Sequence, residues 1–264
     1  MPAPPFESDA AVVRAVEVRD RRARRARIAL GVFRLLIAAL EVVALIGNFQ
    51  YVLGFRFFAT ANFFSYFTVQ SAFLAVVTLG VAGAFALLAT HDPPWLGVVR
   101  TMVTVYVLVS GIVFALIVTQ ASTRDYRVDV PWSDTLLHFV VPSLAVIAWL
   151  ADSIIGVNPP VPWSTIGWVL VFPSAWLVYT LFRGADVGWY PYFFLDEAQV
   201  GGPVGVAFYC ALVLVIFVAL TAGLVAVNRS LWRAAEGRRA RDRRAPQPGT
   251  PGRRGRRASA PALR

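Results

Sequence analysis

Long apolar blocks, separated by shorter polar or aromatic segments, dominate the pattern of this sequence. Six of them cover approximately residues 28–47, 62–89, 98–118, 135–151, 165–182 and 203–227. A helix of roughly 20 apolar residues is long enough to cross the hydrocarbon core of a bilayer. The pattern therefore predicts an all-α, polytopic integral membrane protein with six transmembrane helices in one bundle.

The second block differs from the others because polar side chains surround its first turns. At about 100° per residue, they fall on two opposite sides of a helix: Asn62, Tyr66 and Gln70 on one, and Ser65, Thr68 and Ser71 on the other. Unpartnered polar groups are costly in hydrocarbon, so this end should be enclosed by other helices or face a hydrated cavity. Two interpretations stay open, namely hydrogen bonding between helices and a functional site.

Composition excludes several other classes of protein. With 58% hydrophobic residues in 264, the chain is not a soluble domain. Its single cysteine, Cys210, rules out an intramolecular disulfide framework and a cysteine-based metal site, and neither a metal nor a cofactor is predicted. No P-loop, dinucleotide fingerprint, HExxH or GxSxG motif occurs. All basic residues are Arg, which suggests a GC-rich bacterial genome and a bacterial plasma membrane.

Charge divides the chain into three predicted parts. An Arg-rich N-terminal segment, residues 1–27, carries seven Arg and four acids; the transmembrane domain, 28–228, six Arg and nine acids; and the tail, 229–264, twelve Arg and two acids. Six spans place both ends on one side, which the positive-inside rule identifies as the cytoplasm. The tail is predicted to be disordered from about residue 234. Its expected partners are anionic lipid headgroups, which are favoured over nucleic acid.

His138 is the strongest single indication of chemistry inside a span. Histidine is rare in membrane helices, and its imidazole can accept a proton from an alcohol at neutral pH. Pro142 cannot donate a backbone hydrogen bond to the carbonyl of His138, so a kink is predicted beside the ring. Asp134, one turn earlier, has two open roles. It can orient the imidazole, or, slightly favoured, it can stabilise the start of the helix.

The expected depth of polar side chains in the membrane indicates which of them lie close together. Thr68, His138 and Glu41 are each expected roughly 5 to 10 Å below the outer membrane boundary, where they can share one cavity. A carboxyl at the depth of Glu41 must be neutral, paired or hydrated, and its expected partner is His138 or Arg183. Arg34 belongs to the cytoplasmic half and is interpreted as an interface anchor that extends toward the inner headgroups.

The fifth block ends in Tyr179 and Arg183 and leads into the aromatic segment GWYPYFFLDE, residues 188–197, which includes Tyr190. Trp and Tyr at such a position are typical of an interfacial belt. The alternative is a rim or lid for a lipid that enters from the outer leaflet.

Three short motifs resemble the androgen-induced membrane protein family: Tyr66–Phe67–Thr68, His138 with Pro142, and Gly188–Trp189–Tyr190–Pro191. The similarity covers approximately residues 34–227. It implies a multi-span hydrolase that cleaves fatty-acid esters of hydroxy fatty acids with a threonine nucleophile and a histidine. Carried onto this chain, it implies that Thr68 attacks the ester carbonyl and that His138 takes its proton.

Two hypotheses follow for function. The first is a membrane-embedded lipid ester hydrolase of the outer-leaflet side, with Thr68 and His138 within about 6 Å of each other. In it Asn62, Tyr66 or Gln70 would donate a hydrogen bond to an oxyanion. The second is a non-enzymatic carrier or lipid-binding partner protein, in which the same polar groups and Glu41 form a proton or ligand site.

Overall fold

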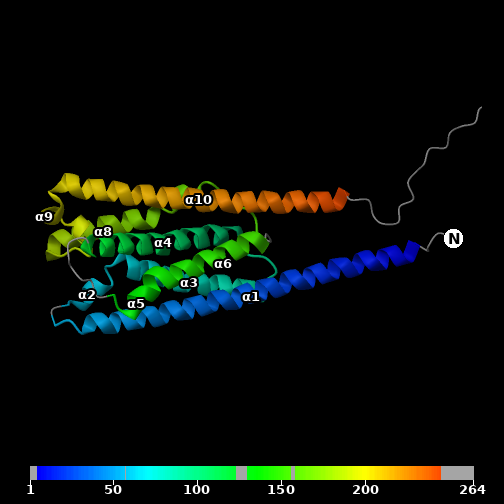
Figure 1. Ribbon diagram of the computed structural model, residues 1–264, viewed down its shortest axis with the longest axis horizontal. Helices are drawn as coiled ribbons and strands as arrows, with labels where there is room; N and C mark the ends of the chain where they lie inside the picture. Colours follow the sequence, from blue (N-terminus) through cyan, green and yellow to red (C-terminus); the bar gives the residue numbers. More distant parts are fainter. Residues whose placement is uncertain (1–4, 57, 123–129, 156–157, 245–264) are drawn as a thin grey trace, which may run out of the picture.

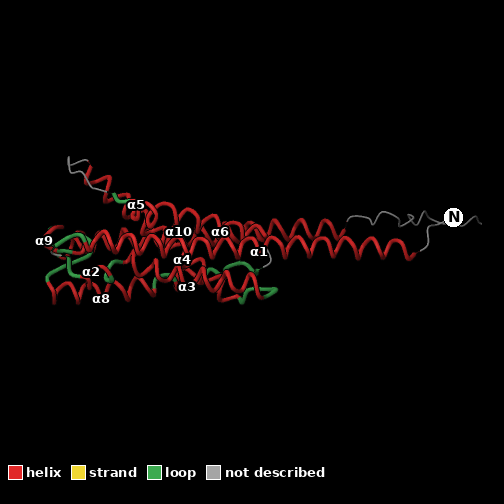
Figure 2. The backbone as a smooth tube through the Cα atoms, turned by 90° about the horizontal axis from the view of Figure 1, so that it is seen from below, coloured by secondary structure: helices red, strands yellow, loops and turns green. Residues whose placement is uncertain are grey.

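The computed structural model describes residues 5–56, 58–122, 130–155 and 158–244, and these are helical almost throughout, with no β-strand among them (Figure 2). Its long helices are α1 (Pro5–Leu53), α3 (Phe67–Leu88), α4 (Pro94–Ser122), α6 (Val141–Ile155), α8 (Val171–Val187) and α10 (Pro203–Arg244). The short ones are α2 (Thr60–Phe63), α5 (Trp132–Thr135), the π-helical η1 (Leu136–Val140), α7 (Thr165–Trp168), the 3-10 turn η2 (Phe193–Leu195) and α9 (Glu197–Val200).

Within the described part of the chain, six helical segments are long and apolar enough to cross a membrane: Asp20–Leu53, Phe67–Leu88, Pro94–Gln120, Trp132–Ile155, Thr165–Val187 and Pro203–Arg238. The protein is thus an all-α, multi-pass membrane protein, as the apolar blocks predicted. The first residues of α1 and the last of α10 extend from the same end of the bundle (Figure 1). We call this end the terminal side.

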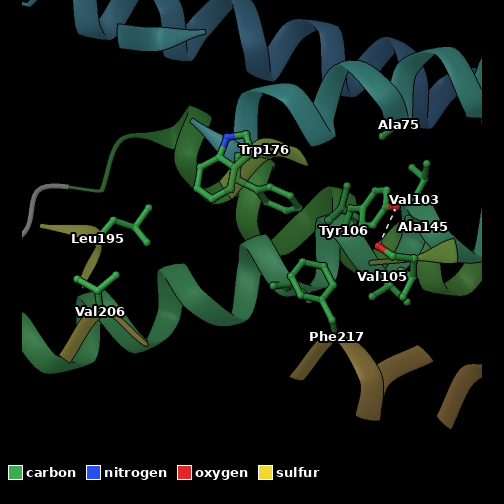
Figure 3. Close-up of a cluster of buried hydrophobic side chains, with 13 residues drawn as sticks. Ala75, Val103, Val105, Tyr106, Ala145, Trp176, Leu195, Val206 and Phe217 are labelled. Carbon is green, nitrogen blue, oxygen red and sulfur yellow. Dashed lines mark hydrogen bonds between the residues drawn. The ribbon is translucent and has the colours of Figure 1, made fainter. Parts of the chain in front are cut away.

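Helix α4 lies at the centre of the bundle, where it packs against α3, α6 and α10, while α1 packs along α3 and α6. Aromatic rings, among them Tyr106, Trp176 and Phe217, fill the space between α3, α4, α8 and α10 (Figure 3). The ring of Phe67 is in edge contact with all three. Tyr106 also donates a hydrogen bond to the carbonyl of Val169 at 3.1 Å. These contacts fix α8 and α10 beside the N-terminal end of α3.

Two predicted boundaries are wrong. The tail is helical to Arg244 instead of disordered from about residue 234, because the segment is rich in Ala and Arg, which favour helix. Residues 245–264 lie outside the described part. The second span begins at Phe67 rather than Asn62, since the chain bends between α2 and α3 and Tyr66 is extended (φ −67°, ψ 135°). Consequently Asn62, Tyr66 and Gln70 do not share one continuous helical face.

Arg34 is not an interface anchor, because its side chain is only 1% exposed and belongs to a buried cluster near the terminal side. The terminal-side ion cluster consists of Arg27, Arg34, Arg100, Asp92 and Asp152. Asp92 pairs with Arg27 at 2.8 Å and with Arg100, while Asp152 pairs with Arg100 at 2.8 Å and with Arg34 at 3.1 Å. The cluster joins α1, the α3–α4 loop, α4 and α6.

Candidate active site

Thr68 is the second residue of α3, and its hydroxyl group lies where four segments meet. Thr68 Oγ1 is 3.3 Å from His138 Nε2, 2.7 Å from Ser110 Oγ and 3.4 Å from the hydroxyl oxygen of Tyr192. These partners come from η1, α4 and the segment between α8 and α10. Thr68 and His138 are therefore closer than the predicted limit of about 6 Å.

The helix that carries His138 accommodates Pro142 with a π-helical turn. Pro142 cannot donate to the carbonyl of His138, and the amide of Val141 instead donates to the carbonyl of Leu136. Such turns occur frequently at functional sites. Helix α4 passes so close that a Cβ atom at Gly111 would lie 2.2 Å from the carbonyl oxygen of His138. Glycine at this position therefore allows η1, and with it His138, to approach α4.

The protonation of the His138 ring follows from its neighbours. Nδ1 lies 3.0 Å from the backbone carbonyl oxygen of Asp134. A carbonyl only accepts, so the bond requires the proton on Nδ1 and leaves the lone pair of Nε2 facing Thr68. The ring is also stacked on Phe114, with centroids 3.9 Å apart and planes 11° apart. This tautomer is the one that can accept the proton of Thr68.

Asp134 acts on the ring through its backbone rather than through its carboxylate. The side chain accepts a hydrogen bond from Asn48 Nδ2, and its Oδ1 is 3.9 Å from His138 Nδ1. No side-chain cap bond forms at the start of α5, where Pro131 occupies the N-cap position. Asp134 nevertheless lies in the first turn of α5, where a carboxylate stabilises the start of a helix through the helix dipole, so its position is compatible with both predicted roles.

Hydrogen-bond directions around Thr68 are fixed by the number of protons. A threonine hydroxyl has one proton to donate, and Nε2 can only accept from it. If Thr68 donates to His138, then the 2.7 Å contact with Ser110 requires the hydroxyl of Ser110 to donate to Thr68 Oγ1. Ser110 would thereby hold the nucleophilic oxygen in the direction of the imidazole.

A cavity of about 490 Å³ opens beside these groups, between α4, α8 and α10. Its polar lining includes Thr68, Ser110, His138 and Tyr192, and most of its wall is apolar, from residues that include Val113, Phe114, Ile117, Leu177, Leu214 and Phe217. The volume lies within the range of sites for small organic ligands. The cavity suits a long apolar chain whose reactive group is placed at Thr68.

The other predicted site residues lie elsewhere and do not line this cavity. Glu41 is 1% exposed, and its Oε2 has no hydrogen-bond partner. Neither of the two partners predicted for Glu41 pairs with it. His138 contacts Asp134 and Thr68 instead. Arg183 donates a hydrogen bond to Asn62 at 2.7 Å and lies 5.5 Å from the centre of the Trp189 ring. Of the remaining four residues, Tyr66 contacts the rings of Trp189 and Tyr192, and Gln70 donates a hydrogen bond to the carbonyl of Phe64. Tyr179 is 49% exposed, and Tyr190 packs on Gly184.

Sequence reasoning missed Ser110 and Tyr192. Ser110 had a signal, because it is a polar residue inside an apolar span, whereas nothing in the aromatic segment distinguished Tyr192 from Tyr190. Within the described residues, no group of three His, Cys, Asp or Glu side chains could hold a metal ion.

Compared with protein-family models, with curated proteins and with solved structures, the chain matches none of them. The resemblance to the androgen-induced membrane protein family therefore stays an expectation from short motifs. What the protein does has to be inferred from the atoms around Thr68.

Proposed function

We propose that the protein is a membrane-embedded lipid ester hydrolase in which Thr68 is the nucleophile and His138 the general base. One observation carries the proposal: Thr68 Oγ1 lies 3.3 Å from the unprotonated nitrogen of an imidazole whose other nitrogen is held by a carbonyl. The adjoining apolar cavity of about 490 Å³ supports a lipid substrate. The motif resemblance suggests fatty-acid esters of hydroxy fatty acids as the substrate class.

The reaction would proceed in two halves. Thr68 Oγ1 bonds to the ester carbonyl carbon as its proton passes to His138 Nε2, and the carbon–oxygen bond to the leaving alcohol breaks as His138 returns that proton to it. Water then attacks the acyl-threonine, gives a proton to His138, and releases the fatty acid while Thr68 regains its hydrogen. Ester and water are consumed, and acid and alcohol are formed.

An alkyl fluorophosphonate tests this proposal, because a base-activated oxygen displaces fluoride and becomes bonded to phosphorus. We expect the wild-type protein in detergent to be labelled on Thr68, as mapped by peptide mass spectrometry, and Thr68→Ala to lose the label. Ser71→Ala is the matched control, since the Ser71 hydroxyl only donates to the Thr68 carbonyl at 3.0 Å. Label on Ser110 would assign the nucleophile differently, and absence of label would favour the non-enzymatic carrier.

Orientation in the membrane belongs to the same proposal. The terminal side carries the described parts of the two Arg-rich ends, with seven Arg in residues 5–27 and seven in residues 229–244, and such excess marks the cytoplasmic face. In a bacterial plasma membrane the site at Thr68 would then lie in the outer half of the bilayer. A substrate from the outer leaflet would reach it, and the basic ends would contact anionic headgroups on the inner surface.

Gly111→Ala is expected to reduce ester hydrolysis by more than about tenfold, because a misplaced base slows proton transfer sharply. The added Cβ would lie 2.2 Å from the carbonyl oxygen of His138, so η1 must move and the imidazole must shift away from Thr68. Hydrolysis of p-nitrophenyl palmitate and the thermal unfolding midpoint measure the two consequences. Gly80→Ala is the control, since a Cβ there meets nothing within 4 Å, and it should leave both quantities unchanged or slightly raise stability.

A further inference from the structure

Tyr192 brings a phenol to the nucleophile from a segment outside the spans. Its hydroxyl oxygen lies 3.4 Å from Thr68 Oγ1 and 3.4 Å from the backbone nitrogen of Thr68. The ring is stacked on Phe194 at 5.2 Å and meets Tyr66 and Trp176 edge-on at 5.7 and 5.8 Å. Removal from solvent raises the pKa of Tyr192 to about 12, so the phenol keeps its proton at neutral pH.

The segment around Tyr192 is shaped to hold this position. Helix α8 is followed by Gly188 in the left-handed conformation (φ 67°), which glycine adopts without strain. Tyr190 packs against Gly184, where a Cβ would lie 2.0 Å from its ring, and Leu195 is 1% exposed. Tyr192 thus projects from a backbone that is anchored on both sides.

The amide of Thr68 is a second donor at the same point. Thr68 lies in the first turn of α3, where backbone N–H groups have no acceptor within the helix. Its N–H donates to the Tyr192 oxygen at 3.4 Å, a long bond that a better acceptor can replace. The positive end of the dipole of this 22-residue helix lies there as well, and it favours negative charge.

We propose that the Tyr192 hydroxyl and the Thr68 amide together form the oxyanion site of the reaction. This inference rests on the proposed function. When Oγ1 bonds to the carbonyl carbon, the electron pair of the carbonyl bond moves onto its oxygen, which lies beside the amide of the same residue. That oxygen replaces the phenol oxygen as the acceptor of the hydrogen bond from the Thr68 N–H, and it also accepts a hydrogen bond from the Tyr192 O–H. The electron pair returns from this oxygen to re-form the carbonyl bond when the alcohol leaves with the proton from His138.

Tyr192→Phe in the full-length protein tests the inference, because it removes one hydroxyl and keeps the stacked ring. With p-nitrophenyl palmitate as substrate, kcat is expected to fall about 10²–10³-fold while KM changes little, since the donor acts mainly on charge that develops in the transition state. Tyr209→Phe is the matched control. Tyr209 belongs to the same aromatic group, 5.9 Å from Phe194, and its loss of a hydroxyl should leave kcat unchanged.

A second substitution covers the case in which Tyr192→Phe does not fold. Replacement of Tyr192 by meta-fluorotyrosine keeps the hydroxyl and makes it more acidic, so kcat should rise; an unchanged or lower kcat overturns the assignment. A wild-type kcat in a folded Tyr192→Phe protein overturns it too. If hydrolysis depends on Thr68 but not on Tyr192, only the oxyanion site is wrong. If the wild-type protein hydrolyses no ester, or Thr68→Ala hydrolyses as fast, the proposed function fails and the inference fails with it.

Discussion

His138→Gln is expected to lower ester turnover by about two to four orders of magnitude, because an amide cannot accept and return the proton of Thr68. Glutamine can still accept a hydrogen bond from the Thr68 hydroxyl and donate one to the carbonyl of Asp134, in place of the hydrogen bonds that the His138 ring makes at 3.3 and 3.0 Å. The variant should therefore stay folded in detergent. Turnover of p-nitrophenyl palmitate and the thermal unfolding midpoint are the two measurements.

The other histidine of the chain supplies the control. His91 lies in the α3–α4 loop, where its Nδ1 is 2.9 Å from Thr90 Oγ1, and His91→Gln should leave turnover unchanged. A His138→Gln protein that unfolds would show that the ring is structural. One that folds and hydrolyses esters at the original rate would contradict the assignment of His138 as base.

The membrane fold was predictable because it depends on length and polarity, which a sequence displays directly. Each of the six spans contains an apolar block long enough for a bilayer, so their number and the common side of the two ends followed. The bend before Phe67 was not predictable, since the residues on both sides of it are polar and aromatic alike. Helix also continued to Arg244, because Ala and Arg sustain it where charge repulsion predicted disorder.

Part of the site was predictable for the same reason, and part of it was not. Thr68 and His138 are polar groups in apolar spans at matching depth, and they proved to be neighbours at 3.3 Å. The choice between Tyr190 and Tyr192 depended on how the segment after α8 folds back. Tyr190 packs on Gly184 whereas Tyr192 reaches Thr68, and this difference arises from the packing of the loop rather than from residue type.

The partners of the Arg34 side chain could not be identified from the sequence. Its depth suggested an interface anchor, but its partners come from distant parts of the chain, Asp92 from the α3–α4 loop and Asp152 from α6. Three guanidinium groups share two carboxylates in this cluster, so each carboxylate neutralises more than one neighbour. Loss of one carboxylate should consequently be more costly than loss of an ordinary surface pair.

Asp92→Asn is expected to destabilise the folded protein by about 3–5 kcal/mol, the cost of breaking a buried pair by removing one partner. The Asp92 side chain is 1% exposed and pairs with Arg27 and Arg100, so the variant leaves three buried cations with Asp152 as their remaining carboxylate in the cluster. Denaturant titration in detergent, followed by tryptophan fluorescence, measures the change. Glu17→Gln is the control: it removes an exposed pair, 3.8 Å from Arg21, and should cost about 0–1 kcal/mol.

The pH dependence of stability provides an independent check on the same pair. Burial alone would raise the pKa of Asp92, but hydrogen bonds and charge from Arg100 and Arg27 outweigh it and hold the pKa below the ordinary 3.8. A carboxyl with a lowered pKa stabilises the fold above its ordinary pKa and loses that contribution as the pH falls through the lowered value. The wild-type protein should thus lose stability as the pH falls below about 4. Asp92→Asn should lack the part of that loss due to Asp92, and an identical decline in both proteins would contradict the assigned pairing.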